Sequence, residues 1–253
     1  MPRLLVPALL ALALLGAPVS VSAQSFTDTQ RGDIEAIVKS YLIAHPEVLE
    51  EAMNELQKRQ TAAETAKHEA SITQNAEAIF NSPRGVTLGN KDGDVTFVEF
   101  FDYNCGYCKR AMSDMLDLMK NDGKLKVVLK EFPVLSEGSV EAAKVAVAVR
   151  MQDPTGKKYL DFHQKLLGGR GVADKARAMA AAKDAGLDTA RIEKDLASPE
   201  VAATLAENMK LAEDMGLNGT PSYVIGRQIV VGAVGLDQLK EKIGVARCGK
   251  ASC

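Results

Sequence analysis

The chain lacks the features that would mark it as a nucleic-acid-binding, metal-cluster or membrane-spanning protein. It carries 31 basic against 33 acidic residues, so no excess of positive charge points to nucleic acid or an anionic membrane. It has only four cysteines and three histidines. None of the histidines has the spacing of a zinc ligand relative to the closely spaced Cys105 and Cys108. An apolar run at residues 4–15 is interrupted by Pro7 and falls well short of the ~20 residues that a spanning helix needs.

The first 23 residues instead have the pattern of a cleavable secretory signal. Arg3 supplies a basic start, residues 4–15 an apolar stretch, and residues 21–23 a cleavage site of small residues. We therefore predict a signal peptide over residues 1–23, a mature protein that begins at Gln24, and a location in the periplasm. All four cysteines lie in the mature part, which fits an oxidising compartment where disulfides persist.

The next segment differs in composition from the rest of the chain. Apolar residues recur at helical spacing before and after a break at His45-Pro46, whereas residues 57–78 contain few large side chains. Such helices have little core to bury within their own chain. We predict a helical stalk and linker at residues 24–85, whose apolar stripe at about residues 34–56 pairs with copies of itself in an oligomer. An exposed helix packed loosely on the globular part is the alternative.

Cys105-Gly106-Tyr107-Cys108 is the most informative motif of the chain. It lies between a predicted strand at residues 95–101 and a predicted helix at residues 108–120. Unpaired N–H groups and the positive end of the dipole at a helix N-terminus favour a thiolate at Cys105. The spacing also brings Cys108 into disulfide range, so Cys105 can attack a partner and Cys108 can resolve the mixed disulfide. A structural disulfide or half of a zinc site would be the other interpretations.

The remaining pattern predicts an α/β domain over residues 86–253. A second strand is expected at residues 125–132, which completes a strand–helix–strand unit. Residues 136–216 are alanine-rich with helical periodicity, and glycine and proline divide them into four or five helices. Strand patterns return at residues 222–225 and 228–231, and a helix at residues 236–243 follows them.

The returning strand opens with Gly219-Thr220-Pro221-Ser222-Tyr223, which resembles the cis-proline loop of the thioredoxin superfamily. With the helical insertion, residues 86–243 resemble the DsbA family of disulfide-bond-forming proteins. Glu99, six residues before Cys105, matches the acidic residue that this family keeps beneath its active site. The resemblance implies a thioredoxin fold with an inserted helical domain and a thiol:disulfide oxidoreductase that needs no cofactor or metal.

The resemblance also implies roles for single residues. Pro221 in cis would expose backbone groups beside the sulfurs for docking of a substrate strand, and Thr220, Gly106 and Tyr107 would line the same surface. A buried Glu99 would accept the proton of Cys108 and would have a raised pKa; the alternative is a solvated carboxylate on an edge strand. His163 is expected to pack within a helix rather than to take part in catalysis.

One departure bears on the direction of the reaction. The best-known oxidases of the family carry Pro-His between the cysteines, whereas Gly106 and Tyr107 supply neither a rigid proline nor an imidazolium. A less stabilised thiolate gives a less oxidising disulfide, which favours isomerisation or reduction. The stalk resembles the N-terminal oligomerisation region of periplasmic disulfide isomerases related to the suppressor-of-copper-sensitivity proteins.

The expected partners are substrate proteins with cysteines, a membrane redox partner and further copies of the chain, but no nucleic acid. Two alternatives are a DsbA-like dithiol oxidase and a copper-binding protein whose thiols hold Cu(I). Cys248 and Cys253, close to the end of the chain, are expected to form a small structural disulfide. A second redox or copper-binding pair is the other interpretation of these two cysteines.

Overall fold

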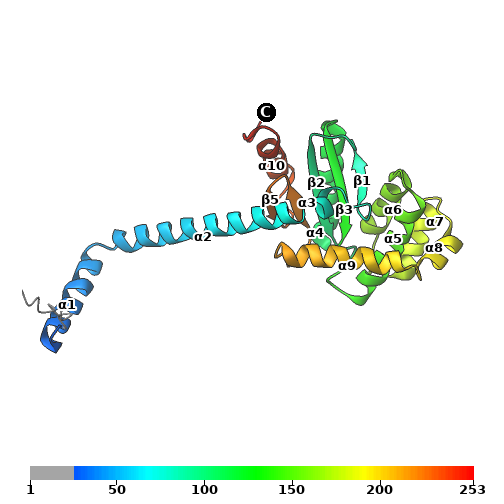
Figure 1. Cartoon of the computed structure of the whole chain (residues 1–253). Coiled ribbons are helices and arrows are strands. Elements are labelled where there is room, and N and C mark those ends of the chain that lie inside the picture. The colour runs from blue at the N-terminus through cyan, green and yellow to red at the C-terminus, as the bar shows by residue number, and fades with distance from the viewer. Residues whose placement is uncertain (1–25) are drawn as a thin grey trace, which may run out of the picture. The chain divides into compact units, whose positions relative to one another are not determined.

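The computed structural model describes residues 26–253, so the predicted signal peptide lies outside the described residues. Contacts divide the chain into two compact units, Met1–Lys58 and Arg59–Cys253. Figure 1 labels the helices of both units and the strands other than β4. No helix in the described part is long and apolar enough to cross a membrane.

The first unit contains α1 (Asp28–Ala44) and the beginning of α2 (Glu47–Gln74). The helix α1 begins earlier than the apolar spacing alone suggests, because Thr27 and Gln30 form a capping box at its N-terminus. It ends at the predicted break, where Pro46 has no N–H to continue the helix. None of the residues of α1 is buried.

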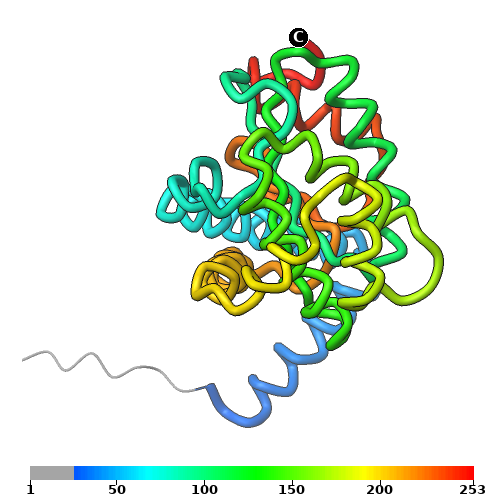
Figure 2. Tube along the Cα trace, turned by 90° about the vertical axis from the view of Figure 1, so that its right-hand side faces the viewer, coloured from blue at the N-terminus to red at the C-terminus, as the bar shows by residue number. Residues whose placement is uncertain are grey.

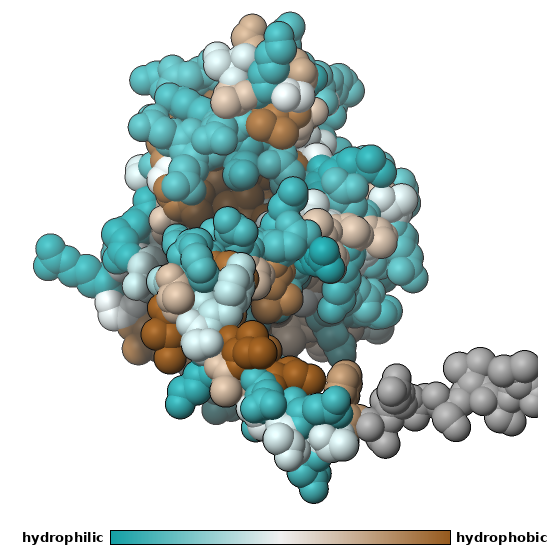
Figure 3. Space-filling model, turned by 90° about the vertical axis from the view of Figure 1, so that its left-hand side faces the viewer, coloured by the Kyte–Doolittle hydropathy of each residue, from teal (hydrophilic) through white to brown (hydrophobic). Residues whose placement is uncertain are grey.

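Large apolar side chains remain open to solvent along the first unit. We call this set the apolar stripe, and it consists of Ile34, Ile37, Val38, Tyr41, Ile43, Leu49, Met53 and Leu56, each at least 41% exposed. In Figure 3, brown apolar side chains reach the surface of the molecule. A soluble helix normally buries such a stripe, so the stripe is consistent with the predicted self-association, which stays a prediction.

The second unit is built on a five-stranded sheet with the strand order β1-β3-β2-β4-β5. The central strand β2 pairs in parallel with β3 and antiparallel with β4, while β1 and β5 are the antiparallel edges. The strands are β1 (Val86–Gly89), β2 (Val95–Phe101), β3 (Leu125–Glu131), β4 (Ser222–Ile225) and β5 (Gln228–Val231). Strand β1 was not among the predicted strands, since four residues are too few to show a clear alternation.

Helices cover both faces of the sheet. One face packs against α4 (Gly106–Asn121) and α10 (Leu236–Cys248), and the core between them includes Phe97, Met115 and Leu239. The other face packs against α3 (Ala76–Phe80) and α9 (Pro199–Asp214) through a second core that includes Phe100 and Leu211. The apolar run of β2 follows from this, because a strand covered on both faces has no polar side.

The insertion predicted between β3 and β4 consists of α5 (Glu137–Gln152), α6 (Lys157–Gly168), α7 (Lys175–Asp184), α8 (Thr189–Asp195) and α9. Figure 2 shows α5 to α8 in front of the sheet, when the second unit is viewed from their side. Small alanines let α5 pack closely against α7, and most of its residues between Ala142 and Val149 are buried. The predicted thioredoxin fold with a helical insertion is therefore confirmed.

The boundary between the units lies within α2, after Lys58, so residues 59–85 of the predicted stalk and linker belong to the second unit. Ile72 at the end of α2 and Ile79 in α3 are buried in the second core. In the segment predicted as a linker, Arg84 forms ion pairs with Glu200 and Glu207 of α9. Two apolar side chains and an ion-pair cluster thus hold the later part of this segment on the domain, although its composition is typical of an exposed helix.

Candidate active site

Cys105 occupies the N-cap position of α4, four residues after β2 ends. Its backbone is extended (φ −82°, ψ 113°), and its sulfur accepts the backbone N–H of Cys108 at 3.3 Å. Its thiol donates to the carbonyl oxygen of Thr220 at 3.2 Å. The side chain is only 6% exposed.

The cis-proline loop lies beside Cys105 because of the strand register. Ser222, the first residue of β4, pairs with Phe100 near the end of β2. The two residues before β4 therefore reach the edge at which the Cys105 loop begins. The Thr220–Pro221 peptide bond is cis. The structure thus brings together the two motifs that lie 115 residues apart in the sequence.

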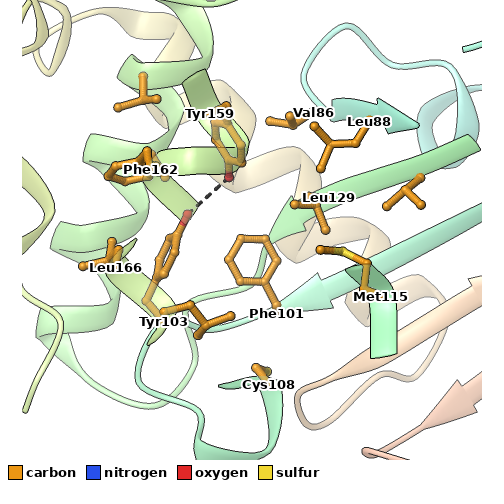
Figure 4. Packing of buried hydrophobic residues seen from close by; sticks show 14 of the residues in the cluster. Val86, Leu88, Phe101, Tyr103, Cys108, Met115, Leu129, Tyr159, Phe162 and Leu166 are labelled. Atoms are coloured by element: carbon orange, nitrogen blue, oxygen red, sulfur yellow. Dashed lines mark hydrogen bonds between the residues drawn. The ribbon is translucent and has the colours of Figure 1, made fainter. Parts of the chain in front are cut away.

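Cys108 lies one helical turn further on and is fully buried. Burial raises the pKa of its thiol far above the usual range; a backbone hydrogen bond from Asp102 opposes this shift, and the charge of Glu99 adds to it. Figure 4 shows Cys108 at the edge of the apolar cluster, next to Phe101. Both cysteines of the CxxC motif are free thiols in this structure. One sulfur is near the surface and the other is covered.

Glu99 lies beneath Cys108 in the middle of β2. Its side chain alternates with those of Val98 and Phe100 and so faces α4, and only 3% of it is exposed. Burial, with a contribution from the charge of Asp114, raises its pKa to about 8. The interpretation as a solvated edge carboxylate is therefore wrong, because β2 is a central strand. Tyr223 on the neighbouring strand β4 pairs with Glu99, and its buried hydroxyl has no hydrogen-bond partner among the described residues.

The two residues between the cysteines are on the surface. An added Cβ at Gly106 would meet no atom within 4 Å. Tyr107 is 61% exposed, and the guanidinium of Arg110 lies over its ring at 4.3 Å. Neither residue places a charge of its own beside the sulfur of Cys105.

Asp102 holds the loop before Cys105 and was not among the predicted site residues. One carboxylate oxygen accepts from the N–H of Asn104 and the hydroxyl of Ser139, both at 2.7 Å. The other accepts from the N–H groups of Val134 and Leu135, at 2.9 and 3.0 Å. A signal was present in the sequence, because an aspartate just after a strand often accepts the backbone N–H two residues further on, as in an Asx turn.

Asn104 connects this loop to the insertion. Its amide exchanges two hydrogen bonds with the backbone of Ala173, at 2.7 and 2.9 Å. The neighbouring Tyr103 hydroxyl lies 3.3 Å from that of Tyr159 (Figure 4), which in turn donates to buried Glu131 at 2.6 Å. The loop that carries Cys105 is thus fixed on both sides by buried polar contacts.

His163 and the C-terminal cysteines lie outside this site. Burial lowers the pKa of His163 to about 3, and its ring packs against Phe101 and Tyr103, as expected for a packing residue. Cys248 and Cys253 are joined by a disulfide. No group of three or more histidine, cysteine or acidic residues in the described part of the chain is arranged to hold a metal ion.

Two family models match the chain. Residues 96–244, more than half of the chain, match the DSBA-like thioredoxin domain. Residues 30–63 match the N-terminal domain of the copper resistance protein ScsC.

Solved structures and curated proteins give similar results. A thioredoxin-like oxidoreductase from Silicibacter pomeroyi is 43% identical, with a TM-score of 0.64, over 68% of this chain and 96% of its own. A linker-deletion mutant of Proteus mirabilis ScsC is 29% identical, with a TM-score of 0.66, over 89% of this chain and 98% of its own. The Bacillus subtilis disulfide bond formation protein D is 26% identical over 64% of this chain and 77% of its own length.

The chain spans only 24% of another curated relative, the Na(+)/H(+) antiporter NhaA 1 of Salinispora arenicola, to which it is 25% identical over 161 residues. The DSBA-like match covers the strand that carries Glu99, the CxxC motif, the insertion and the cis-proline loop. The chain therefore belongs to the DsbA family of thiol:disulfide oxidoreductases.

Proposed function

We propose that the chain is an exported thiol:disulfide interchange protein that acts on cysteines of other proteins through Cys105 and Cys108, with isomerisation or reduction as its main direction. The observation that carries the proposal is the position of Cys105. Its sulfur lies at the N-terminus of α4, 3.2 Å from the carbonyl oxygen that precedes Pro221. A substrate strand docked on that backbone would present its own sulfur to Cys105.

The reaction proceeds by two exchanges in this proposal. The Cys105 thiolate attacks one sulfur of a substrate disulfide, which forms a mixed disulfide and releases the other substrate sulfur as a thiolate. In reduction, Cys108 loses its proton, attacks the sulfur of Cys105 and frees the reduced substrate, leaving a Cys105–Cys108 disulfide. In isomerisation, the freed substrate thiolate attacks another substrate disulfide, and a later substrate thiolate displaces Cys105.

The residues between the cysteines support this direction. A strong oxidant stabilises its reduced thiolate, whereas Gly106 contributes no side chain and Tyr107 holds its cationic neighbour, Arg110, over its own exposed ring. The apolar stripe supports assembly of several copies through the first unit. The leader pattern supports export to the periplasm, where a membrane redox partner would restore the thiols.

Glu99 is proposed as the group that accepts the proton of Cys108. With a pKa of about 8, its ionised fraction grows as the pH rises through 8. Resolution of the mixed disulfide should therefore accelerate as the pH rises through about 8 and level off above it. Glu99→Gln should remove this inflection in the pH–rate profile and slow resolution at least ~10-fold. This is a conservative bound, because a general base typically contributes about 100-fold or more to a rate. Stopped-flow measurement of product release from a preformed mixed disulfide between pH 6 and 10 checks this, with the pH values chosen around that pKa.

Glu131→Gln is the matched control, because Glu131 is also fully buried but lies on β3 and binds the hydroxyl of Tyr159. The inflection near pH 8 should persist in this variant. Stability provides a second readout. Glu99 ionises at a much lower pH in the unfolded chain than in the folded chain. The wild type should therefore lose stability as the pH rises towards 8, whereas Glu99→Gln should not show this loss. An unchanged inflection in Glu99→Gln would show that another group accepts the proton.

A copper-binding protein is the competing function, because two thiols suit Cu(I) and residues 30–63 match the ScsC N-terminal domain. In the test, the reduced protein is incubated separately with scrambled ribonuclease and with Cu(I) supplied from a competing chelator, and the two activities are compared. We expect turnover of the ribonuclease by substoichiometric protein. Stoichiometric Cu(I) binding without any ribonuclease turnover would instead favour the copper function.

A further inference from the structure

A groove lies beside Cys105, between the start of α4 and the loop that joins α6 to α7. Cys105, Gly106 and Lys109 form one side, and residues 169–171 form the other. Tyr103, Leu166 and Leu167 line its inner part, and Figure 4 shows Leu166 next to Tyr103. The cavity has a volume of about 310 Å³. A peptide attached to Cys105 through its own cysteine would have to pass this groove or the cis-proline loop.

Positive charge gathers along the groove. Lys109 and Arg170 line it directly, and both are exposed. None of the described residues that line it is acidic. The charge of both side chains is also uncompensated, because neither takes part in an ion pair within the described part of the chain.

The loop at residues 169–171 contacts two cationic side chains, Lys109 and Arg177. The amine of Lys109 donates to the carbonyl oxygen of Gly169 at 2.6 Å. The guanidinium of Arg177 packs against the same loop, so close that a Cβ added at Gly169 or Gly171 would lie within 3.0 Å of its nitrogens. Arg170 stands between these two glycines. The arrangement places three cations along one short loop next to the attacking sulfur.

We infer that this groove binds an acidic segment of the substrate next to the cysteine that Cys105 attacks. A cleft lined by one sign of charge concentrates the field and attracts the opposite charge. Carboxylates two to four residues from the substrate cysteine would reach Lys109 and Arg170 while the sulfur reaches Cys105. The apolar inner surface would accept the side chains between them. The inference rests on the proposed exchange at Cys105 and adds to it a preference for acidic sequence around the target cysteine.

Three peptides with a single central cysteine, flanked on both sides by aspartate, serine or lysine, provide the test. Each is supplied as its pyridyl disulfide to the full-length reduced protein. In the reaction, two electrons from Cys105 and Cys108 reduce the peptide disulfide, pyridine-2-thione and the peptide thiol are released, and the Cys105–Cys108 disulfide forms. The release of the thione gives the rate constant.

We expect the aspartate peptide to react at least ~10-fold faster than the lysine peptide in dilute buffer, and the ratio to fall to about 2 in 1 M salt, where the screening length is ~3 Å. The variants Lys109→Gln and Arg170→Gln, singly and together, should progressively lose this preference. The matched control changes Lys157 and Arg227 to glutamine, because both are exposed cations that do not line the groove.

The outcomes separate the inference from the activity on which it rests. Equal rates for the three peptides, or an equal loss of preference in the control variant, would overturn the acidic-segment inference while leaving exchange at Cys105 intact. Failure of the wild type to react with any peptide, including the serine peptide, would overturn the exchange activity and the inference with it.

Discussion

Cys105→Ser is expected to abolish thiol:disulfide exchange, whereas Cys108→Ser is expected to accumulate mixed disulfides with substrate proteins. The asymmetry follows from burial and position. Cys105 is at the N-cap of α4 with its sulfur next to the cis-proline loop, while Cys108 is fully covered and its thiol pKa is strongly raised. A serine at 105 leaves no sulfur that a substrate can reach, and a serine at 108 leaves nothing to resolve the first adduct.

Non-reducing gels and mass spectrometry after incubation with a disulfide-containing substrate measure both effects. The double change Cys248→Ser and Cys253→Ser is the control, because these cysteines are already joined to each other, and it should retain exchange. Adducts that form through Cys108 in the Cys105→Ser variant would reverse the assignment of the two roles.

Removal of residues 24–58 is expected to convert an oligomer into a monomer and to lower reactivation of scrambled ribonuclease several-fold, without lowering simple dithiol oxidation. Several Cys105 thiolates held near one misfolded substrate raise the effective concentration of the attacking group. Oxidation of a dithiol needs only one pair of cysteines. The deletion ends at Lys58 because residues 59–85 belong to the second unit, in whose core Ile72 and Ile79 are buried.

Light scattering gives the mass of both proteins. Assays of scrambled-ribonuclease reactivation and of dithiol oxidation give the two activities. Ile37→Glu with Met53→Glu offers a version without truncation, since both side chains are about 70% exposed in the apolar stripe. Lys39→Glu, an exposed position on α1, controls for added negative charge. Monomeric masses for both the full-length and the truncated protein would rule out the oligomer, and equal isomerisation by the two proteins would give the first unit another purpose.

The elements that the sequence predicted well are those whose pattern is local. The CxxC motif at a strand end, the helical break at Pro46 and the strands that follow Pro221 depend on neighbouring residues, and the structure has them at or near the predicted positions. The insertion was also visible, because glycine and proline separate its alanine-rich helices.

What the sequence did not reveal depends on contacts between distant residues. Nothing in the composition of residues 59–85 indicates that Ile79 is buried against the sheet or that Arg84 pairs with α9. The anchoring of the active-site loop by Asp102 needs Ser139 and Val134 from a later segment. The groove beside Cys105 likewise needs the loop at residues 169–171, more than 60 positions away from the nucleophile.

Reactivation of scrambled ribonuclease by the full-length protein in a glutathione buffer, compared with oxidation of reduced ribonuclease in the same buffer, distinguishes isomerisation from oxidation. We expect that scrambled ribonuclease regains activity at substoichiometric protein concentration, that Cys105→Ser does not support this, and that reactivation rather than oxidation is the larger catalytic effect. Rapid oxidation of reduced ribonuclease with no reactivation of the scrambled form would contradict this expectation and would assign the chain to the dithiol oxidases.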